Sequence, residues 1–353
     1  MKYFEIYNTV NLLLIALITI RIFYDKNEKT IIIIILTSIF STLCSIQYLL
    51  FNSPDVAITE ISIGACITTV FILKSSFCLR QKEKKQITGL VDKNKEGNID
   101  KCNRIFKYGI FSLFFALFII FFEKTSFHFP RITSDSLPFL YNDTIKHYIE
   151  QTKDFLQFPN IVTAIIISFR GYDTLIETIV ILTAGISVTS ILSQNKSIQQ
   201  ITKSILYDKS IISNVVMLIL PFIILFAFYI QAHGEESPGG GFQSGSILAT
   251  AIIGYSITIS EDLIRKYLTN SLLMRIGTIG VLLYFTVGLI PIFKGQNFLN
   301  HNYVTCGATN LISECHSSSQ KISIFISELG VGMTVFAVMT IIFFNLKSEK
   351  KYE

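Results

Sequence analysis

Long apolar runs separated by short polar segments dominate the chain. A membrane-spanning helix needs about 20 apolar residues, because the hydrocarbon core is about 30 Å thick and a helix rises about 1.5 Å per residue. Nine runs approach that length, at residues 7–23, 31–51, 55–78, 105–122, 176–194, 211–232, 242–260, 272–293 and 321–345. The pattern predicts an all-α integral membrane protein with about nine transmembrane helices.

Two shorter features qualify this count. The stretch IVTAIIISF at residues 161–169 is apolar but too short to cross the bilayer, and it predicts either the front of a bent helix or a re-entrant piece. At the N-terminus only Lys2 precedes the first run, and no small-residue cleavage site follows it. We therefore expect residues 7–23 to remain as the first helix and not to be removed as a signal peptide.

The basic residues predict how the helices are oriented. With nine spans, the loops on one side carry 21 Lys and Arg residues and those on the other side carry 8. Cytoplasmic loops are enriched in basic residues, so the N-terminus is expected outside and the C-terminus in the cytoplasm. The same rule accounts for the net charge of +5, so we expect no nucleic-acid partner. Lys74 lies inside a span near its cytoplasmic end and is expected to snorkel to the interface.

The spacing of the runs divides the chain into blocks. Since 50% of the residues are hydrophobic and 16% are charged, the chain as a whole is expected to have lipid as its main solvent. The blocks are a three-helix segment at 1–79, a basic cytoplasmic linker at 80–104, a two-helix segment at 105–194 with a long outside loop at 123–160, and a four-helix segment at 205–345.

Carboxylates inside the apolar runs are the strongest functional signal. A charge at the middle of a bilayer costs at least about 2.5–3.5 kcal/mol, so such residues are usually paired or functional. Pro54 suits the first turn of a helix, which places Asp55 near its positive end as an interfacial cap. Glu60 lies deeper and is expected to have a buried ionisable role. Glu328 in the last run is either a buried polar contact or a proton-path carboxylate.

A second acidic pair lies at the start of the fifth run. Asp173 and Glu177 are four residues apart, so they share one helix face and repel unless a cation or a shared proton lies between them. Arg170 is the nearest cation in the sequence. One interpretation is a structural ion pair between Arg170 and Asp173 at the membrane edge, and the other is proton or cation handling by Glu177.

The segment AHGEESPGGGFQSGSILA at residues 232–249 is unusual for a connection between two spans. Its consecutive glycines permit backbone conformations that other residues avoid, and irregular backbone at membrane depth survives only beside water or protein. His233 could relay protons, because its ordinary pKa is about 6.5. The alternative is a tight turn in the headgroup region, built on Pro238, Gly239, Gly240 and Gly241.

Other chemistry is sparse in the sequence. Cys306 and Cys315 share the last outside loop and could pair as a disulfide if that side is oxidising. No zinc-ligand spacing and no nucleophile–base pair stands out, so we expect no metal, no cofactor and no enzymatic activity.

Several of these stretches carry a family resemblance. HGEESPGGGFQSGSILATA, residues 272–300 and SELGVGMTVFAVM resemble the B subunit of multisubunit Na+/H+ antiporters of the Mrp/Mnh type, in the order found in that family. SPDVAITEISIGA and FRGYDTLIETIVIL resemble the hydrogenase-like tail of the A subunit of these antiporters. The chain therefore looks like an A-subunit tail fused to a B subunit.

The resemblance implies an accessory, multi-pass subunit in the cell (inner) membrane, in a complex that exchanges monovalent cations such as Na+ for protons. Other polytopic subunits would be its partners, because nothing in this chain resembles the pumping subunits. The matching motif positions make ion-path candidates of Glu60, Asp173, Glu177, His233 and Glu328. Glu235 and Glu236 stand where the family usually has a His-Asn type pair, which leaves the chemistry of this loop open.

Two other functions remain open at the sequence level. The same modules occur as membrane subunits of energy-converting hydrogenases, so the chain is alternatively a proton-translocating membrane-arm subunit of a hydrogenase-like or respiratory complex. A third interpretation is a membrane scaffold without an ion path.

Overall fold

The computed structural model describes residues 2–24, 30–76, 143–152, 159–193, 210–259, 261–305 and 313–346, and no strand occurs in these ranges. The all-α class is therefore confirmed. The chain divides into two compact units, one formed by Met1–Gln81 with Gln151–Glu353 and the other by Lys82–Glu150. In the second unit the described helix is α6, at Asp143–Gln151.

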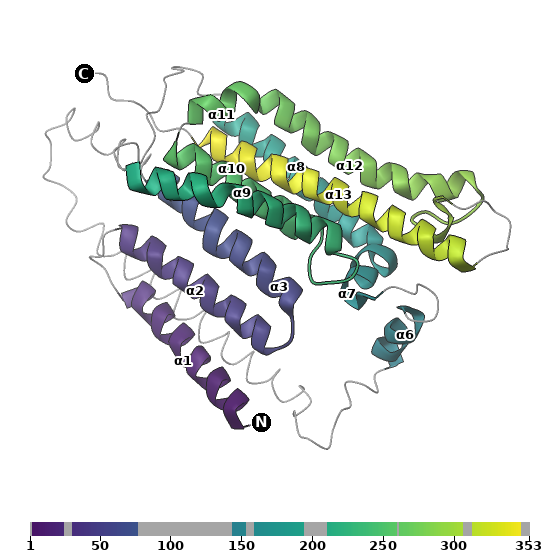
Figure 1. The fold of residues 1–353 in the computed structure, drawn as a ribbon, viewed down its shortest axis with the longest axis horizontal. Helices are drawn as coiled ribbons and strands as arrows, with labels where there is room; N and C mark the ends of the chain where they lie inside the picture. Colours follow the sequence, from purple (N-terminus) through teal and green to yellow (C-terminus); the bar gives the residue numbers. More distant parts are fainter. Residues whose placement is uncertain are drawn as a thin grey trace, which may run out of the picture. The chain divides into compact units, whose positions relative to one another are not determined.

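The first unit holds the long apolar helices (Figure 1). In chain order its elements are α1 (Lys2–Tyr24), α2 (Thr30–Leu50), α3 (Pro54–Thr59), the π-helical η1 (Glu60–Thr68), α7 (Ile161–Thr163), the π-helical η3 (Ala164–Phe169), α8 (Gly171–Ser193), α9 (Ser210–His233), α10 (Gly241–Thr258), α11 (Glu261–Tyr267), α12 (Asn270–Phe293), the 3-10 helix η4 (His301–Tyr303) and α13 (Ser313–Asn345). The helix that contains η1 continues to Ser76.

The chain is a multi-pass membrane protein by the length and composition of its helices. Six described helices are long and apolar enough to cross a membrane, at Ile31–Leu50, Pro54–Ser76, Gly171–Leu192, Ser213–His233, Asn270–Phe293 and Ser319–Asn345. A shorter apolar helix covers Ile6–Ile22, and α10 occupies most of the expected span 242–260. The expected span 105–122 lies outside the described residues. The total of nine spans and the orientation remain predictions.

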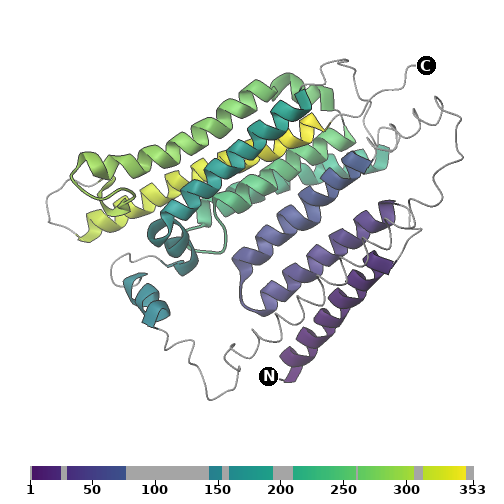
Figure 2. The same ribbon diagram turned by 180° about the vertical axis from the view of Figure 1, so that it is seen from behind.

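Helix α13 is the core of the first unit, because it packs against α8, α10 and α12 (Figure 1; Figure 2 shows α8 from behind). Small residues allow the close approach. A Cβ atom at Gly241 of α10 would overlap the carbonyl oxygen of Glu328, and one at Gly245 would overlap that of Gly332. Such backbone-to-backbone contact is how helices associate without a hydrophobic driving force between them. The close contact between α10 and α13 places Glu328 directly beside the start of α10.

The N-terminal helices attach to this core through α3 and η1. Helix α2 packs on α1 and on η1, and η1 packs on α10. The last contact includes a buried hydrogen bond of 2.8 Å between the hydroxyl groups of Ser246 on α10 and Ser62 on η1. A polar pair buried in this way joins two segments that lie far apart in the sequence.

The short apolar stretch 161–169 forms a separate helical piece, α7 with η3, in front of α8. Its backbone leaves helical geometry at Arg170, where φ is −116° and ψ is 29°, and α8 then begins at Gly171. The hydroxyl of Thr174 donates to the carbonyl of Ile166 at 2.8 Å, which bridges the break. This arrangement matches the expected front of a bent helix.

Lys74 does not snorkel, contrary to the expectation from its position in the span. Its side chain is 5% exposed, and its Nζ lies 3.1 Å from Glu261 Oε2 and donates to the carbonyl of Phe343 at 2.8 Å. Arg265 binds the other oxygen of Glu261 at 2.6 Å and donates to the carbonyl of Phe344. We call Lys74, Glu261 and Arg265 the paired cluster. Lys74 therefore binds a carboxylate within the fold, whereas a snorkelling lysine would reach the solvent at the membrane surface.

Candidate ion-binding cavity

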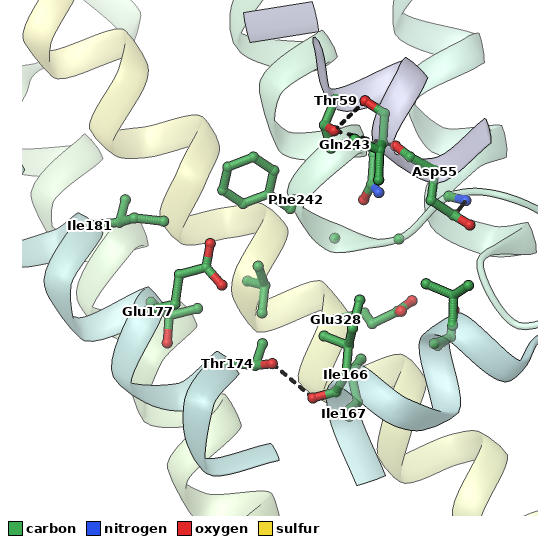
Figure 3. Close-up of a pocket in the computed structure, with 18 residues that line it drawn as sticks. Asp55, Thr59, Ile166, Ile167, Thr174, Glu177, Ile181, Phe242, Gln243 and Glu328 are labelled. Atoms are coloured by element: carbon green, nitrogen blue, oxygen red, sulfur yellow. Dashed lines mark hydrogen bonds between the residues drawn. The ribbon is translucent and has the colours of Figure 1, made fainter. Parts of the chain in front are cut away.

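A cavity of about 340 Å³ lies where α3, η3, α8, α10 and α13 approach one another. We call it the acidic cavity, because Asp55, Glu177 and Glu328 line it together with uncharged residues. Figure 3 shows Glu177 on one side of it and Asp55 on the other. Carboxylates from three separate segments of the sequence therefore share one space.

Asp55 reaches the cavity from the first turn of α3. Pro54 occupies the start of this helix, as the sequence predicted, since its missing N–H is not needed there. The backbone N–H of Gly239 donates to Asp55 Oδ1 at 2.9 Å. Asp55 is thus half-buried and binds the glycine-rich connection, a contact that its expected role as an interfacial cap did not include.

Residues 234–240 form the connection between α9 and α10, and Asn160 holds it in place. The Asn160 side chain donates to the carbonyls of Gly234 and Ser237, both at 3.1 Å, and accepts from two N–H groups of α7 as its N-cap. Thr163 donates to the same Gly234 carbonyl at 2.8 Å. The connection is therefore a turn held by specific hydrogen bonds, whereas its expected place in the headgroup region stays a prediction.

The three consecutive glycines of this connection meet different requirements. Only Gly240 has a positive φ, of 137°, which side-chain-bearing residues rarely adopt. A Cβ at Gly239 would lie 2.8 Å from the carbonyl oxygen of Ile230, and Gly241 is needed for contact with α13. The sequence predicted backbone freedom for all three glycines, whereas two of them are required for close packing.

Glu328 is the most deeply buried carboxylate of the cavity. Its residue is 4% exposed, and its Oε2 atom has no hydrogen-bond partner within the described residues. A Cβ at Gly234 would lie 2.9 Å from Oε2, and a Cβ at Gly240 would lie 3.1 Å from Oε1. The two glycines therefore leave room for the carboxylate, and a buried acid without a partner is costly unless a proton or a cation accompanies it.

Glu177 and Asp173 share a helix face but have different surroundings. Asp173 is bound by Arg170, with a distance of 2.6 Å between Arg170 Nη2 and Asp173 Oδ2, and both side chains are more than half exposed. Glu177 is exposed and lines the acidic cavity. The expected ion pair between Arg170 and Asp173 is present at the start of α8. Asp173 therefore has a cationic partner, whereas Glu177 lines the cavity.

Glu60 and His233 lie outside the lining of the cavity. Glu60 accepts a hydrogen bond of 2.8 Å from Ser41 of α2, which makes it a polar contact between two helices. His233 is exposed at the end of α9, where its ring stacks on Tyr229 with 4.3 Å between the centroids. The structure therefore brings Glu177 and Glu328 together and separates them from the other three predicted residues.

Two ionisable groups near the cavity lie outside the spanning helices. Burial raises the pKa of Glu235; the positive charge of Lys321 opposes this shift, and the negative charge of Glu236 adds to it. Burial lowers the pKa of His301 from its ordinary 6.5 to about 4, against the opposing effect of its hydrogen bond to the carbonyl of Ile167. His301 is therefore a neutral side chain that ties η4 to η3.

Sequence reasoning missed Asn160, Thr163 and Gln243. Asn160 had a usable signal, because Asn directly before an apolar run is a common N-cap. Gln243 lines the cavity, but nothing in its sequence context separated it from other polar residues of α10. In the part of the chain that the structure describes, no group of three or more His, Cys, Asp or Glu is placed to hold a metal ion. Cys306 and the side chain of Cys315 lie outside the described residues, so their pairing remains a prediction.

Fold and site together define a multi-pass membrane protein with a buried carboxylate, Glu328, between closely packed helices, the class that contains ion-transport subunits. Within that class, residues 211–341 match the family described as "Domain related to MnhB subunit of Na+/H+ antiporter", and residues 12–80 match the MbhD family, described as a subunit of MBH. The putative antiporter subunit mnhB2 of Staphylococcus aureus strain Newman is 28% identical over 137 residues, which are 38% of this chain and 92% of that protein. The predicted resemblance to Mrp/Mnh-type antiporter subunits is confirmed.

Two solved structures share the fold. A chain of the Mrp complex from Dietzia sp. DQ12-45-1b superposes with a TM-score of 0.67 and 16% identity, covering 98% of this chain and 35% of that one. This protein thus spans about a third of the length of that neighbour. The membrane-bound sulfane sulfur reductase, an archaeal respiratory membrane complex, gives a TM-score of 0.50 and 22% identity, covering 69% of this chain and 99% of that one.

Proposed function

We propose that this protein is an accessory subunit of a multisubunit monovalent cation/proton antiporter in the cell membrane, with Glu328 as its main ion-handling side chain. The similarity to antiporter subunits over 211–341 supports the class of complex. Larger polytopic subunits are its partners, and they carry the pumping machinery. Na+ is the cation that the names of its relatives favour.

One observation carries the proposal: the two segments with family matches meet at the acidic cavity. Asp55, within the matched segment 12–80, accepts a hydrogen bond from Gly239, within the matched segment 211–341. Glu328 lies beside this contact with an unpartnered oxygen. A buried carboxylate at the junction of two modules suits ion exchange, because the membrane interior tolerates such groups only with a proton or a cation.

The test uses the whole complex in everted membrane vesicles from a host that lacks its own antiporters. Addition of NaCl should collapse a preformed pH gradient when every subunit is present, and should leave it intact when this chain is deleted. Glu328→Gln should abolish most of the exchange, while Asp262→Asn, a change at an exposed carboxylate of α11, should leave it unchanged. A chain that purifies as a stable monomer, and whose deletion leaves exchange and salt tolerance intact, would contradict the proposal.

A second candidate function is a membrane-arm subunit of a redox-driven complex. It is favoured by the match of residues 12–80 to the MbhD family and by the likeness to the sulfane sulfur reductase complex. Partners that carry iron–sulfur clusters would then purify with the chain, and their absorbance would bleach on reduction. Co-purification of antiporter-like subunits alone favours the first function.

A further inference from the structure

We infer that the Glu328 carboxyl is an exchange site that binds either one proton or one dehydrated monovalent cation, with Gln243 as a second oxygen ligand. This inference rests on the proposed function, and it states which ions bind to Glu328. A Cβ at Gly240 would lie 3.1 Å from Glu328 Oε1 and 3.3 Å from Gln243 Oε1. The two oxygens therefore face the same small space, which the positive φ of Gly240 reserves for a residue without a side chain.

The charges around this space favour a positively charged occupant, and Glu328 supplies the carboxylate that faces it. Glu328 has an unpartnered oxygen, and no Lys or Arg forms an ion pair with it among residues that the structure describes. One carboxylate neutralises one positive charge, which suits a proton or a monovalent cation. The carboxylates of Asp55 and Glu235 also act on Glu328 electrostatically, and their negative potential favours a cation there.

The other side of the acidic cavity supplies a route to the site. Glu177 is exposed and lines the same cavity, so an arriving cation can keep its water there before it reaches the buried carboxylate. Asp55 is less available as a ligand, because its Oδ1 already accepts the Gly239 N–H. Glu328 is thus the buried end of this cavity, with the half-buried Gln243 beside it, and Glu177 is its exposed end.

The experiment labels the purified whole complex with dicyclohexylcarbodiimide, which reacts with protonated carboxyl groups in apolar surroundings. Mass spectrometry then measures the labelled fraction of the peptide that contains Glu328. We expect labelling without sodium and protection by NaCl, so that labelling falls about tenfold when sodium reaches ten times its dissociation constant, as mass action requires. Choline chloride at equal ionic strength should not protect.

Matched glycine variants test the geometry of the site. Gly234→Ala places a methyl group 2.9 Å from Glu328 Oε2, so it should raise the sodium concentration needed for half-protection severalfold. Gly254→Ala on α10 is the control, because a Cβ there meets nothing within 4 Å. Equal protection curves for the two variants would show that crowding the Glu328 carboxylate does not affect sodium binding, and would overturn the exchange site.

The outcomes separate this inference from the proposed function. If vesicles exchange Na+ for protons but Glu328 is unlabelled, or is labelled without protection by sodium, the exchange site is wrong and the function stands. If the complex shows no exchange while sodium still protects Glu328 at low concentration, the site stands and the antiporter function falls. Glu328→Gln must remove the label from this peptide, since a label that persists would belong to another carboxyl group.

Discussion

Two groups of buried charge contact α13, and the fold treats them in opposite ways. In the paired cluster, Lys74 and Arg265 share Glu261, and both cations also donate to carbonyls at the C-terminal end of α13. The acidic cavity lies about 22 Å further along α13, since a helix rises about 1.5 Å per residue. There Glu328 is as buried as Lys74, but one of its oxygens has no partner within the described residues.

This difference separates a structural use of buried charge from a functional one. Both groups join the N-terminal segment, through Lys74 and Asp55, to the C-terminal helices. Each side chain of the paired cluster has a partner inside the protein, because Lys74 and Arg265 each bind Glu261 and a backbone carbonyl of α13, and the excess positive charge of the cluster disfavours a mobile cation. In the acidic cavity an oxygen of Glu328 has no partner within the described residues, which is the arrangement that our proposal assigns to an ion path in a membrane.

The largest effect should come from breaking the paired cluster. Lys74→Met removes two hydrogen bonds of a buried cation, to Glu261 and to the carbonyl of Phe343, and hydrogen bonds to charged groups contribute about 1.5–3 kcal/mol each. We expect a large fall in the thermal stability of the complex in detergent and in the amount of chain that assembles. Exchange activity per assembled complex should stay close to that of the wild type.

The control for this prediction is Lys146→Met, which removes the exposed pair between Lys146 and Glu150. That change should leave thermal stability and assembly almost unchanged. Lys74→Met complexes that assemble normally but fail to exchange ions would contradict the structural role of the paired cluster, which would then belong to the ion path.

His301 is a third buried ionisable group, and the fold keeps it uncharged. Its pKa of about 4 lies below the ordinary 6.5, so the unfolded chain binds a proton on acidification before the folded protein does. The contribution of His301 to the free energy of unfolding is therefore fully present above pH 6.5 and is lost as the pH drops toward 4. The loss is about 2 kcal/mol at pH 5 and about 3 kcal/mol in total.

The measurement is the change in melting temperature between pH 7 and pH 5 for wild type and for His301→Gln, which keeps a donor for the Ile167 carbonyl. The variant should lose less stability on acidification, and other titrating groups cancel in the difference. Equal losses in both proteins would mean that His301 is protonated in the folded state.

The fold was largely predictable from the sequence, because apolar runs of spanning length have few alternatives in a membrane. The helix boundaries of α9 and α12 lie close to those expected, whereas α13 begins at Ser313, before the expected run 321–345. The break at Arg170 follows the short run before it. The pairing of Lys74 was not predictable. Its partner Glu261 is distant in the sequence, and local position alone favours the snorkelling that the structure contradicts.

The candidate site was predictable only in part. Buried carboxylates stand out in apolar runs, so Glu328 and Glu177 were found by the cost of burying them. The same rule also selected Glu60 and Asp173, because it does not show whether a neighbour such as Ser41 or Arg170 already satisfies the charge. Which carboxylates share a cavity depends on helix packing, and a single sequence does not specify it.

A smaller effect of opposite sign is expected when the unpartnered acid is removed. Glu328→Met exchanges a buried carboxyl with an unsatisfied oxygen for an apolar side chain of similar length, which should stabilise the protein by about 1–2 kcal/mol. Ion exchange should be lost at the same time. Melting temperatures of the variant and the wild type in the same detergent test this, and a destabilised Glu328→Met would place Glu328 with the structural charges of the paired cluster.

The smallest effect is expected at Asp173, one helical turn before Glu177 on the same face of α8. Its ion pair with Arg170 is more than half exposed, and such pairs contribute at most about 1 kcal/mol. Asp173→Asn should therefore change stability little and leave exchange within about twofold of the wild type, whereas Glu177→Gln should slow exchange because Glu177 lines the cavity. The two variants remove one carboxylate each from the same helix face, so each serves as the control for the other. Initial exchange rates in vesicles decide between them: equal losses would extend the ion path to Asp173, while a loss confined to Glu177→Gln would limit the path to the carboxylates that line the cavity.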